Sequence, residues 1–452
     1  MVPVRRRDKV VIAQVRPQRS SWSPKRILLA NTVRMPAAMA PLAIVLSEGD
    51  TKRALAAGSL LVSIFTIGEI FLSSRFAKLG DRTAPVLALV RLLAPLALVW
   101  TIFVLLSPQF GNRNNFIALS ILAFLVGGLG AGLFGIARNL ILVKSPQHIE
   151  HDPIVIHRII GVDTVIMEMF FLVAPLIVSS SIILGGSRAT GISTTAIVLI
   201  GLLASLISSR QRENHASESV VKPQPKNTKR IRLFDSVWFY PKATWIFVAS
   251  AAMGVGEGGL IIAVPTIFVE KKLGLGYVGL DVAMISLGSI VGGSITTQFA
   301  RLFSRARIRV RLGTYLLGLL SAVIAVTTLN QIVPILLATF VAGLFVAPLN
   351  TTRALAIEAV VPDGKKSEAF GALYGSYSIG FALVGMTLGA LSLQASASNL
   401  LAGVSFMAFI AALFLVFFTP IPNRTAIAFE SEKFGTSATS TSYNIKSSLV
   451  EQ

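Results

Sequence analysis

The sequence predicts an all-α membrane protein with twelve transmembrane helices in two six-helix bundles. The first observation is composition: 53% of the 452 residues are hydrophobic and only 14% are charged, which is typical of helices packed in lipid. The second is length, because apolar runs of about 20 residues, enough to cross a hydrocarbon core of about 30 Å, recur along almost the whole chain. The third is that these runs lack alternating apolar and polar positions, which excludes an outer-membrane β-barrel.

Twelve of these runs are predicted to cross the membrane as helices, because lipid offers backbone groups no other hydrogen-bond partner. Their predicted bounds are 27–47, 55–76, 86–107, 116–137, 159–183, 191–209, 243–267, 275–299, 312–329, 332–356, 368–393 and 399–419. The longest polar interruption, 210–242, has the Pro, Ser and Lys content of a flexible cytoplasmic linker. The predicted domains are therefore a basic N-terminal tail (1–26), an N-terminal six-helix bundle (27–209), the linker (210–242), a C-terminal six-helix bundle (243–419) and a C-terminal tail (420–452).

The distribution of positive charge indicates the topology. The formal net charge is +20, which in a soluble protein would suggest a nucleic-acid partner. With the N-terminus placed in the cytoplasm, 33 of the 41 Lys and Arg residues lie on that side, in its flanks and loops or at the adjoining ends of the spans, and only 6 lie in the opposite loops. This asymmetry predicts that both termini are cytoplasmic. It also explains the basicity without any nucleic acid.

One polar stretch, "AKLGDRTAPV" (77–86), resembles the signature between helices 2 and 3 of the major facilitator superfamily. Leu79, Asp81 and Arg82 match, whereas the glycines and the terminal basic pair of the signature are replaced. In that family the loop aspartate pairs with basic residues near the cytoplasmic ends of neighbouring helices and holds the outward-open state. The resemblance therefore implies a gating role for Asp81, with Arg138 at the end of the fourth span as its partner. The alternative is a turn with solvated charges.

Three further stretches resemble an actinobacterial branch of the same superfamily that is often labelled as efflux proteins. "RIIGVDTVIMEMFFLVAPLI" (158–177) is similar to the fifth-helix pattern of that branch, with Asp163 and Glu168 at matching positions. "VGLDVAMISLGSIVGGSI" (278–295) resembles its eighth helix, and "VVPDGKKSEAFGALYGSYSIGFALVG" (360–385) resembles its loop into helix 11.

The resemblance covers about residues 27–420 and implies the major facilitator fold, in which two bundles hold a small-molecule substrate near the membrane midplane. It further implies a monomeric, multi-pass protein of the bacterial plasma (inner) membrane. The identity of the substrate does not follow from membership of a fold family.

Charged residues inside the predicted spans are the candidates for function, because each costs about 2.5–3.5 kcal/mol at bilayer depth even on insertion scales. Arg34 lies in the first span, Glu69 in the second, and Asp163 and Glu168 in the fifth. Helices 1 and 5 are neighbours in the family that the chain resembles. We therefore expect Arg34 to pair with Asp163 or Glu168, either as a static packing contact or as part of coupling.

Glu257 lies near the midplane of the seventh span, in "AAMGVGEGGLIIAVP", with glycines on both sides. We expect no Lys or Arg inside the other spans of the second half to pair with it. A carboxylate in such a setting is expected to take up and release protons near neutral pH, so Glu257 is the first proton-coupling candidate, followed by Asp163 and Glu168. The alternative is a Glu that bonds backbone groups freed by the glycines.

The sequence thus predicts a secondary active transporter that works by alternating access and exports a small, partly apolar solute or drug in exchange for protons. The alternatives are uptake or facilitated diffusion of a metabolite, and a non-transporting receptor or assembly protein of the same fold. No enzyme activity, cofactor or metal site is expected, because no phosphate-binding loop, nucleophile elbow or paired-carboxylate signature is visible and the chain has no cysteine.

Overall fold

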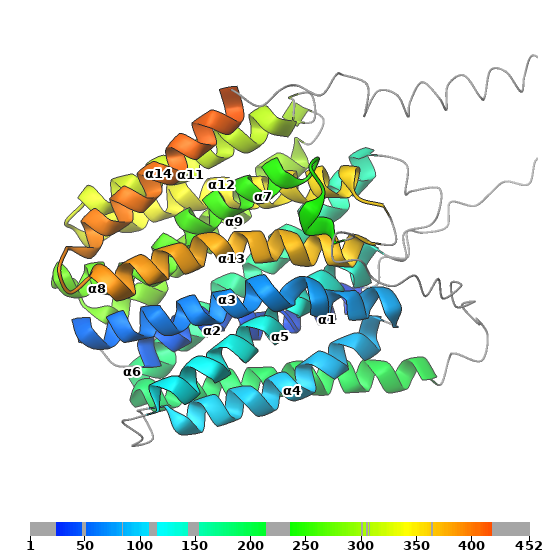
Figure 1. Ribbon diagram of the computed structural model, residues 1–452, viewed down its shortest axis with the longest axis horizontal. Coiled ribbons are helices and arrows are strands. Elements are labelled where there is room, and N and C mark those ends of the chain that lie inside the picture. Colours follow the sequence, from blue (N-terminus) through cyan, green and yellow to red (C-terminus); the bar gives the residue numbers. More distant parts are fainter. Residues whose placement is uncertain are drawn as a thin grey trace, which may run out of the picture.

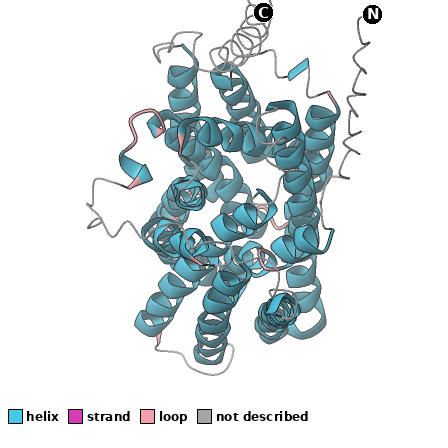
Figure 2. Cartoon of the chain, turned by 90° about the vertical axis from the view of Figure 1, so that its right-hand side faces the viewer, coloured by secondary structure: helices cyan, strands magenta, loops and turns pink. Residues whose placement is uncertain are grey.

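The computed structural model describes residues 24–47, 51–83, 85–107, 115–142, 153–213, 236–299, 302–303, 306, 308–362 and 365–417. Within these ranges every regular element is a helix, as Figure 2 shows in a view along the bundle. Twelve helical segments there are long and apolar enough to cross a membrane, which confirms the predicted all-α membrane protein. Nearly all of the predicted tails, and residues 214–235 of the predicted linker, lie outside the described residues.

The helices form two bundles that pack side by side (Figure 1). The first bundle consists of α1 (Pro24–Thr32), α2 (Met35–Ser47), α3 (Lys52–Arg82), α4 (Pro85–Leu106), α5 (Phe116–Leu142) and α6 (Pro153–Glu213). The second bundle follows the short 3₁₀ helix η4 (Val237–Phe239). It consists of α7 (Thr244–Gly258), η5 (Gly259–Ala263), α8 (Val264–Glu270), η6 (Leu275–Tyr277), α9 (Val278–Gln298), α11 (Ile308–Thr328), α12 (Ile332–Val360), α13 (Lys366–Leu391) and α14 (Ala397–Phe417).

The first span is interrupted at Arg34, between α1 and α2. Pro36 has no N–H, and its ring clashes with the carbonyl group four residues earlier, which disfavours a regular helix at this point. The Arg34 N–H instead donates to the Asn31 carbonyl oxygen at 3.1 Å, which forms a tighter turn. This turn lies in the protein interior, where the Arg34 side chain is only 1% exposed.

The fifth and sixth spans both belong to α6, which folds back on itself at two glycines. Gly185 and Gly186 have non-helical dihedral angles, and the φ of Gly186 is 67°, a conformation that glycine adopts without steric cost. The Ser181 hydroxyl donates to the Ser193 hydroxyl at 3.0 Å, a contact that residues so far apart in sequence could not make in a straight helix. The predicted break between spans 159–183 and 191–209 is therefore present.

The seventh span changes its helical pitch beside Glu257. α7 ends at Gly258, and the π-helical turn η5 connects it to α8. Pro265 lies at the start of α8, where its missing N–H disfavours a regular α-helical turn before it. Such π turns often occur at functional sites, so this irregularity marks the region around Glu257.

The two bundles meet mainly along two helix pairs, α3 with α13 and α6 with α9. Figure 1 shows α3 and α13 lying alongside each other. A Cβ atom at Gly385 of α13 would lie 2.4 Å from the Ser63 hydroxyl, and one at Gly279 of α9 would lie 1.9 Å from the Ser179 hydroxyl. Small residues thus allow the bundles to approach closely.

The polar stretch 77–86 is largely helical. The second span is predicted to end at residue 76, but its helix continues beyond that residue. α3 continues to Arg82, and both the N–H and the hydroxyl of Thr83 donate to the Leu79 carbonyl oxygen, at 3.0 and 2.7 Å. These bonds end the helix because they satisfy a carbonyl group of its last turn. The side chains of Asp81, Arg82 and Arg138 fall outside the described residues, and so does their predicted pairing.

Candidate functional site

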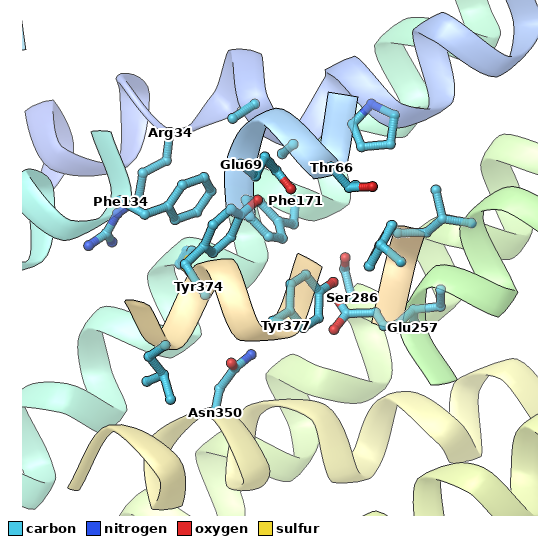
Figure 3. Close-up of a pocket in the computed structure, with 18 of the residues that line it drawn as sticks. Arg34, Thr66, Glu69, Phe134, Phe171, Glu257, Ser286, Asn350, Tyr374 and Tyr377 are labelled. Atoms are coloured by element: carbon cyan, nitrogen blue, oxygen red, sulfur yellow. The ribbon is translucent and has the colours of Figure 1, made fainter. Parts of the chain in front are cut away.

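A cavity of about 100 Å³ lies between the bundles, with walls from both. Its lining combines charged and aromatic side chains. The charged ones are Arg34, Glu69, Glu257 and Arg353, and the aromatic ones are Phe134, Phe171, Phe370, Tyr374, Tyr377 and Phe381. In the view of Figure 3, Arg34 and Glu257 lie on opposite sides, with Glu69 and two tyrosines between them. The cavity therefore offers fixed charges of both signs within an aromatic wall.

Arg34 and Asp163 form the buried ion pair that the sequence analysis anticipates. Nη1 of Arg34 lies 2.8 Å from Oδ1 of Asp163, and the two side chains are 1% and 3% exposed. The same nitrogen lies 3.2 Å from Oδ1 of Asn31, and the guanidinium carbon lies 6.0 Å from the centre of the Phe134 ring. Removing one partner of such a pair costs about 3–5 kcal/mol, because the other charge stays buried.

Glu69 of α3 faces α13 across the boundary between the bundles. The Ser378 hydroxyl donates to Oε2 of Glu69, and the Tyr374 hydroxyl faces the same carboxylate (Figure 3). Oε1 of Glu69 is buried and has no hydrogen-bond partner among the described residues. Among the described residues, the polar neighbours of this carboxylate are thus hydroxyl groups rather than cations.

An aromatic row connects the two bundles beside Glu69. The rings of Phe134 and Tyr374 stack with centroids 4.2 Å apart and an interplanar angle of 14°, although they belong to different bundles. Phe171 meets Phe134 edge-on at 6.2 Å, and Tyr377 lies 5.7 Å from Tyr374. These rings offer flat apolar surface together with the negative faces of their π-systems.

Glu257 has a cationic neighbour, so the expectation that it lacks one is wrong. Arg353 of α12 lines the same cavity and interacts electrostatically with Glu257. Arg353 lies close to the end of the predicted tenth span, but α12 continues to Val360, which keeps this arginine inside the protein and only 7% exposed. The Tyr377 hydroxyl faces the Glu257 carboxylate, and the guanidinium carbon of Arg353 lies 5.2 Å from the Tyr377 ring centre.

Glu168 belongs to this second cluster and does not pair with Arg34. It is 1% exposed, and its charged neighbours are Glu257 and Arg353. Asn350 lies beside it and accepts a hydrogen bond from Arg353 through Oδ1. The structure therefore brings a carboxylate of each bundle together with one arginine.

Sequence reasoning did not single out Arg353 and Asp281 as buried charges. Asp281 of α9 is fully buried and accepts a hydrogen bond of 2.9 Å from the Thr339 hydroxyl on α12. It does not belong to the cavity lining. Both residues fall within predicted spans, 275–299 and 332–356, so their positions inside apolar segments were the signal that could have identified them.

An ion pair joins the bundles at each end of α3. Lys52 at the start of α3 lies 2.7 Å from Oε1 of Glu270 at the end of α8. Lys78 near the end of α3 lies 3.1 Å from Oε1 of Glu368 in the first turn of α13. The cavity thus lies between two contacts that hold the bundles together.

The sequence matches the profile of the Major Facilitator Superfamily over residues 27–336, which is more than half of the chain. Among solved structures, the crystal structure of the human organic anion transporter MFSD10 (TETRAN) is similar, with a TM-score of 0.58 and 13% sequence identity. The similarity covers 87% of this chain and 100% of that chain. At this identity the likeness shows the fold alone. A comparison with curated proteins finds no match.

Proposed function

The chain belongs to the major facilitator superfamily of membrane transporters, and we propose that it is a secondary active transporter that exports a small, partly apolar solute in exchange for protons. Alternating access would expose the cavity first to one side of the membrane and then to the other. By the positive-inside rule, we assign both termini, the linker 210–242 and the Lys78 end of α3 to the cytoplasm of a bacterial cell. The protein would work as a monomer in the plasma membrane, with its two bundles at 27–209 and 243–419.

The observation that carries the proposal is the cluster of Glu168, Glu257 and Arg353. One arginine compensates only one of two carboxylates, and an uncompensated charge in a low-dielectric interior is costly. Uptake of one proton would neutralise the cluster. Because Glu168 belongs to the first bundle and Glu257 to the second, moving the bundles changes the distance between the two carboxylates and hence the cost of charging both.

Asp163 and Asp81 take supporting roles in this proposal. Asp163 would keep Arg34 in place at the cavity wall, since the ion pair already satisfies both charges. Asp81, within the motif that also contains Leu79 and Arg82, would hold the cytoplasmic side closed together with Arg138, as the resemblance of that motif implies.

Transport into everted membrane vesicles tests the proposal. The solutes would be a panel of labelled aromatic cations, neutral molecules and anions, measured with and without a proton gradient. We expect at least one solute to accumulate only when the gradient is present. Equal uptake without a gradient would indicate a facilitator, and no uptake of any solute would favour a non-transporting role.

Glu257→Gln is the decisive variant, because it keeps the shape of the side chain and removes its titration. We expect it to abolish gradient-driven accumulation while solute exchange across the membrane remains detectable. Asp281→Asn is the matched control, because it changes another buried acid outside the cavity lining and should keep accumulation. If Glu257→Gln accumulates solute as well as the parent protein does, Glu257 is not the coupling residue. Glu168 or Asp163 would then be the candidate.

An organic anion is a second candidate substrate. The human protein with the similar fold is named an organic anion transporter, and Arg34 and Arg353 line the cavity of this chain. Both arginines already face carboxylates, Asp163 and Glu257. We therefore rank an organic anion below the partly apolar solute proposed first. Accumulation of the anions alone from the same panel would favour it.

A further inference from the structure

We propose that Glu69 binds the positively charged group of the transported solute, and that the substrate is therefore an organic cation with an aromatic or aliphatic body. This inference rests on the proposed transport function and adds the chemical class of its substrate. It contrasts with the organic anion in the name of the structurally similar human protein.

The first argument is the balance of charge around the cavity. Two arginines and two glutamates line it, but each arginine has a further carboxylate behind it. Asp163 pairs with Arg34 at 2.8 Å, and Glu168 interacts with Arg353. Four carboxylates, those of Glu69, Asp163, Glu168 and Glu257, thus surround the cavity together with only two arginines. This excess of acidic groups favours a cationic ligand.

The second argument is the incomplete environment of Glu69. Its side chain is only 2% exposed, and it faces the hydroxyls of Ser378 and Tyr374. Oε1 has no hydrogen-bond partner in the described part of the chain, although Glu69 lines the cavity. A buried carboxylate without a cation must be neutralised, and a ligand cation in the cavity can do this directly.

The third argument is the aromatic surface next to Glu69. Tyr374, which faces the carboxylate, stacks on Phe134, and Phe171 meets Phe134 edge-on (Figure 3). A cation is attracted to aromatic ring faces within about 6 Å of it, and the attraction is stronger when the cation is desolvated. A carboxylate beside such rings is therefore suited to an ammonium group with an apolar substituent.

The site also connects substrate binding to the movement of the bundles. Glu69 and Phe134 belong to the first bundle, whereas Tyr374 and Ser378 belong to α13 of the second. A cation held at Glu69 would contact both bundles at once. Binding would therefore favour the arrangement in which α3 and α13 lie together.

Direct binding to the purified full-length protein in lipid nanodiscs tests the inference. The probes are phenyltrimethylammonium and benzenesulfonate, two aromatic ions of similar size and opposite charge. Isothermal titration without any proton gradient should show binding of the cation at least about 10-fold tighter than binding of the anion. Equal or tighter binding of benzenesulfonate, or no binding of the cation, would overturn the inference.

Variants then locate the binding group. Glu69→Gln should weaken phenyltrimethylammonium binding by at least about 10-fold, and Glu69→Asp, which restores the charge, should recover part of the loss. Asp281→Asn should bind like the parent. Unchanged affinity in Glu69→Gln would overturn the inference, and the two-probe comparison on the parent decides the charge class even if that variant does not fold.

The binding assay needs no gradient, so its outcome is independent of proton coupling. If coupling through Glu257 fails while Glu69 binds the cation, the proposed function falls and the inferred site remains. If Glu69→Gln binds normally and still accumulates solute against a gradient, only the inference falls.

Discussion

The two ends of α3 both pair a lysine with a glutamate of the second bundle, but their surroundings differ. At one end, the side chains of Lys52 and Glu270 are 35% and 17% exposed. At the other end, the side chains of Lys78 and Glu368 are 27% and 5% exposed. Because water weakens exposed ion pairs, the shorter distance at the Lys52 end does not make it the stronger contact.

The partners of the two glutamates differ as well. Oε1 of Glu368 also accepts hydrogen bonds from the Ser236 hydroxyl at 3.0 Å and the Val237 N–H at 3.3 Å, just before the second bundle. Glu270 accepts from the Ala397 N–H at 2.9 Å, at the start of α14 within its own bundle. One carboxylate thus joins both bundles and the segment between them. We expect the Lys78 end, which we assign to the cytoplasm, to be the more firmly closed.

Among variants at the two ends of α3, Glu368→Gln should have the largest effect on the separation of the bundles. It removes the charge that Lys78, Ser236 and Val237 share, and the loss of a buried charge-assisted contact costs about 1–3 kcal/mol. The chain has no cysteine, so spin labels at two introduced cysteines report without background. Labels at the exposed positions Arg75 and Pro362 should show a wider separation of the bundles at this end.

The control for this variant is Glu358→Gln on the same side of the protein. Glu358 pairs with Lys366 at 2.6 Å, and both residues belong to the second bundle. This control should leave the distance between the two labels unchanged. If Glu368→Gln and its control give the same distance distribution, the Glu368 contact does not hold the bundles together.

Glu270→Gln should have a smaller effect at the opposite end. The pair that it disrupts is more exposed, and such pairs contribute about 0.2–1 kcal/mol. Labels at the exposed positions Arg53 and Gly276 should show a modest increase in the open population. An opening larger than the one that Glu368→Gln causes would reverse the order of the two ends.

Ser236→Ala should have the smallest effect on the separation of the bundles. It tests how much the segment before the second bundle contributes to closure. Glu368 keeps Lys78 and the Val237 N–H as partners, so we expect a loss of about 0.5 kcal/mol at the Lys78 end, the lower end of the range for one hydrogen bond. The Arg75 and Pro362 labels provide the measurement. A shift as large as that of Glu368→Gln would mean that the segment, rather than the ion pair, controls closure.

The sequence predicted the twelve spans well because length and apolar character are local properties. It also anticipated the Arg34–Asp163 contact, since a buried charge needs a partner and helices 1 and 5 are neighbours in the family that the chain resembles. It assigned Glu168 less well. This residue lies five positions after Asp163 on the same helix, which places it about 140° further around the helix axis, so it faces Arg353 rather than Arg34.

By itself, the sequence determined that this protein is a helical membrane protein with an excess of basic residues on one side, because lipid imposes both properties on each segment separately. Which charges meet depends on how the helices pack against one another. Glu257 meets Arg353 and Lys78 meets Glu368 across long stretches of sequence, and spans that are apolar on every face carry no pattern that specifies which side faces a neighbour. Close packing at residues such as Gly385 sets that rotation, and so it is packing that assembles the cavity.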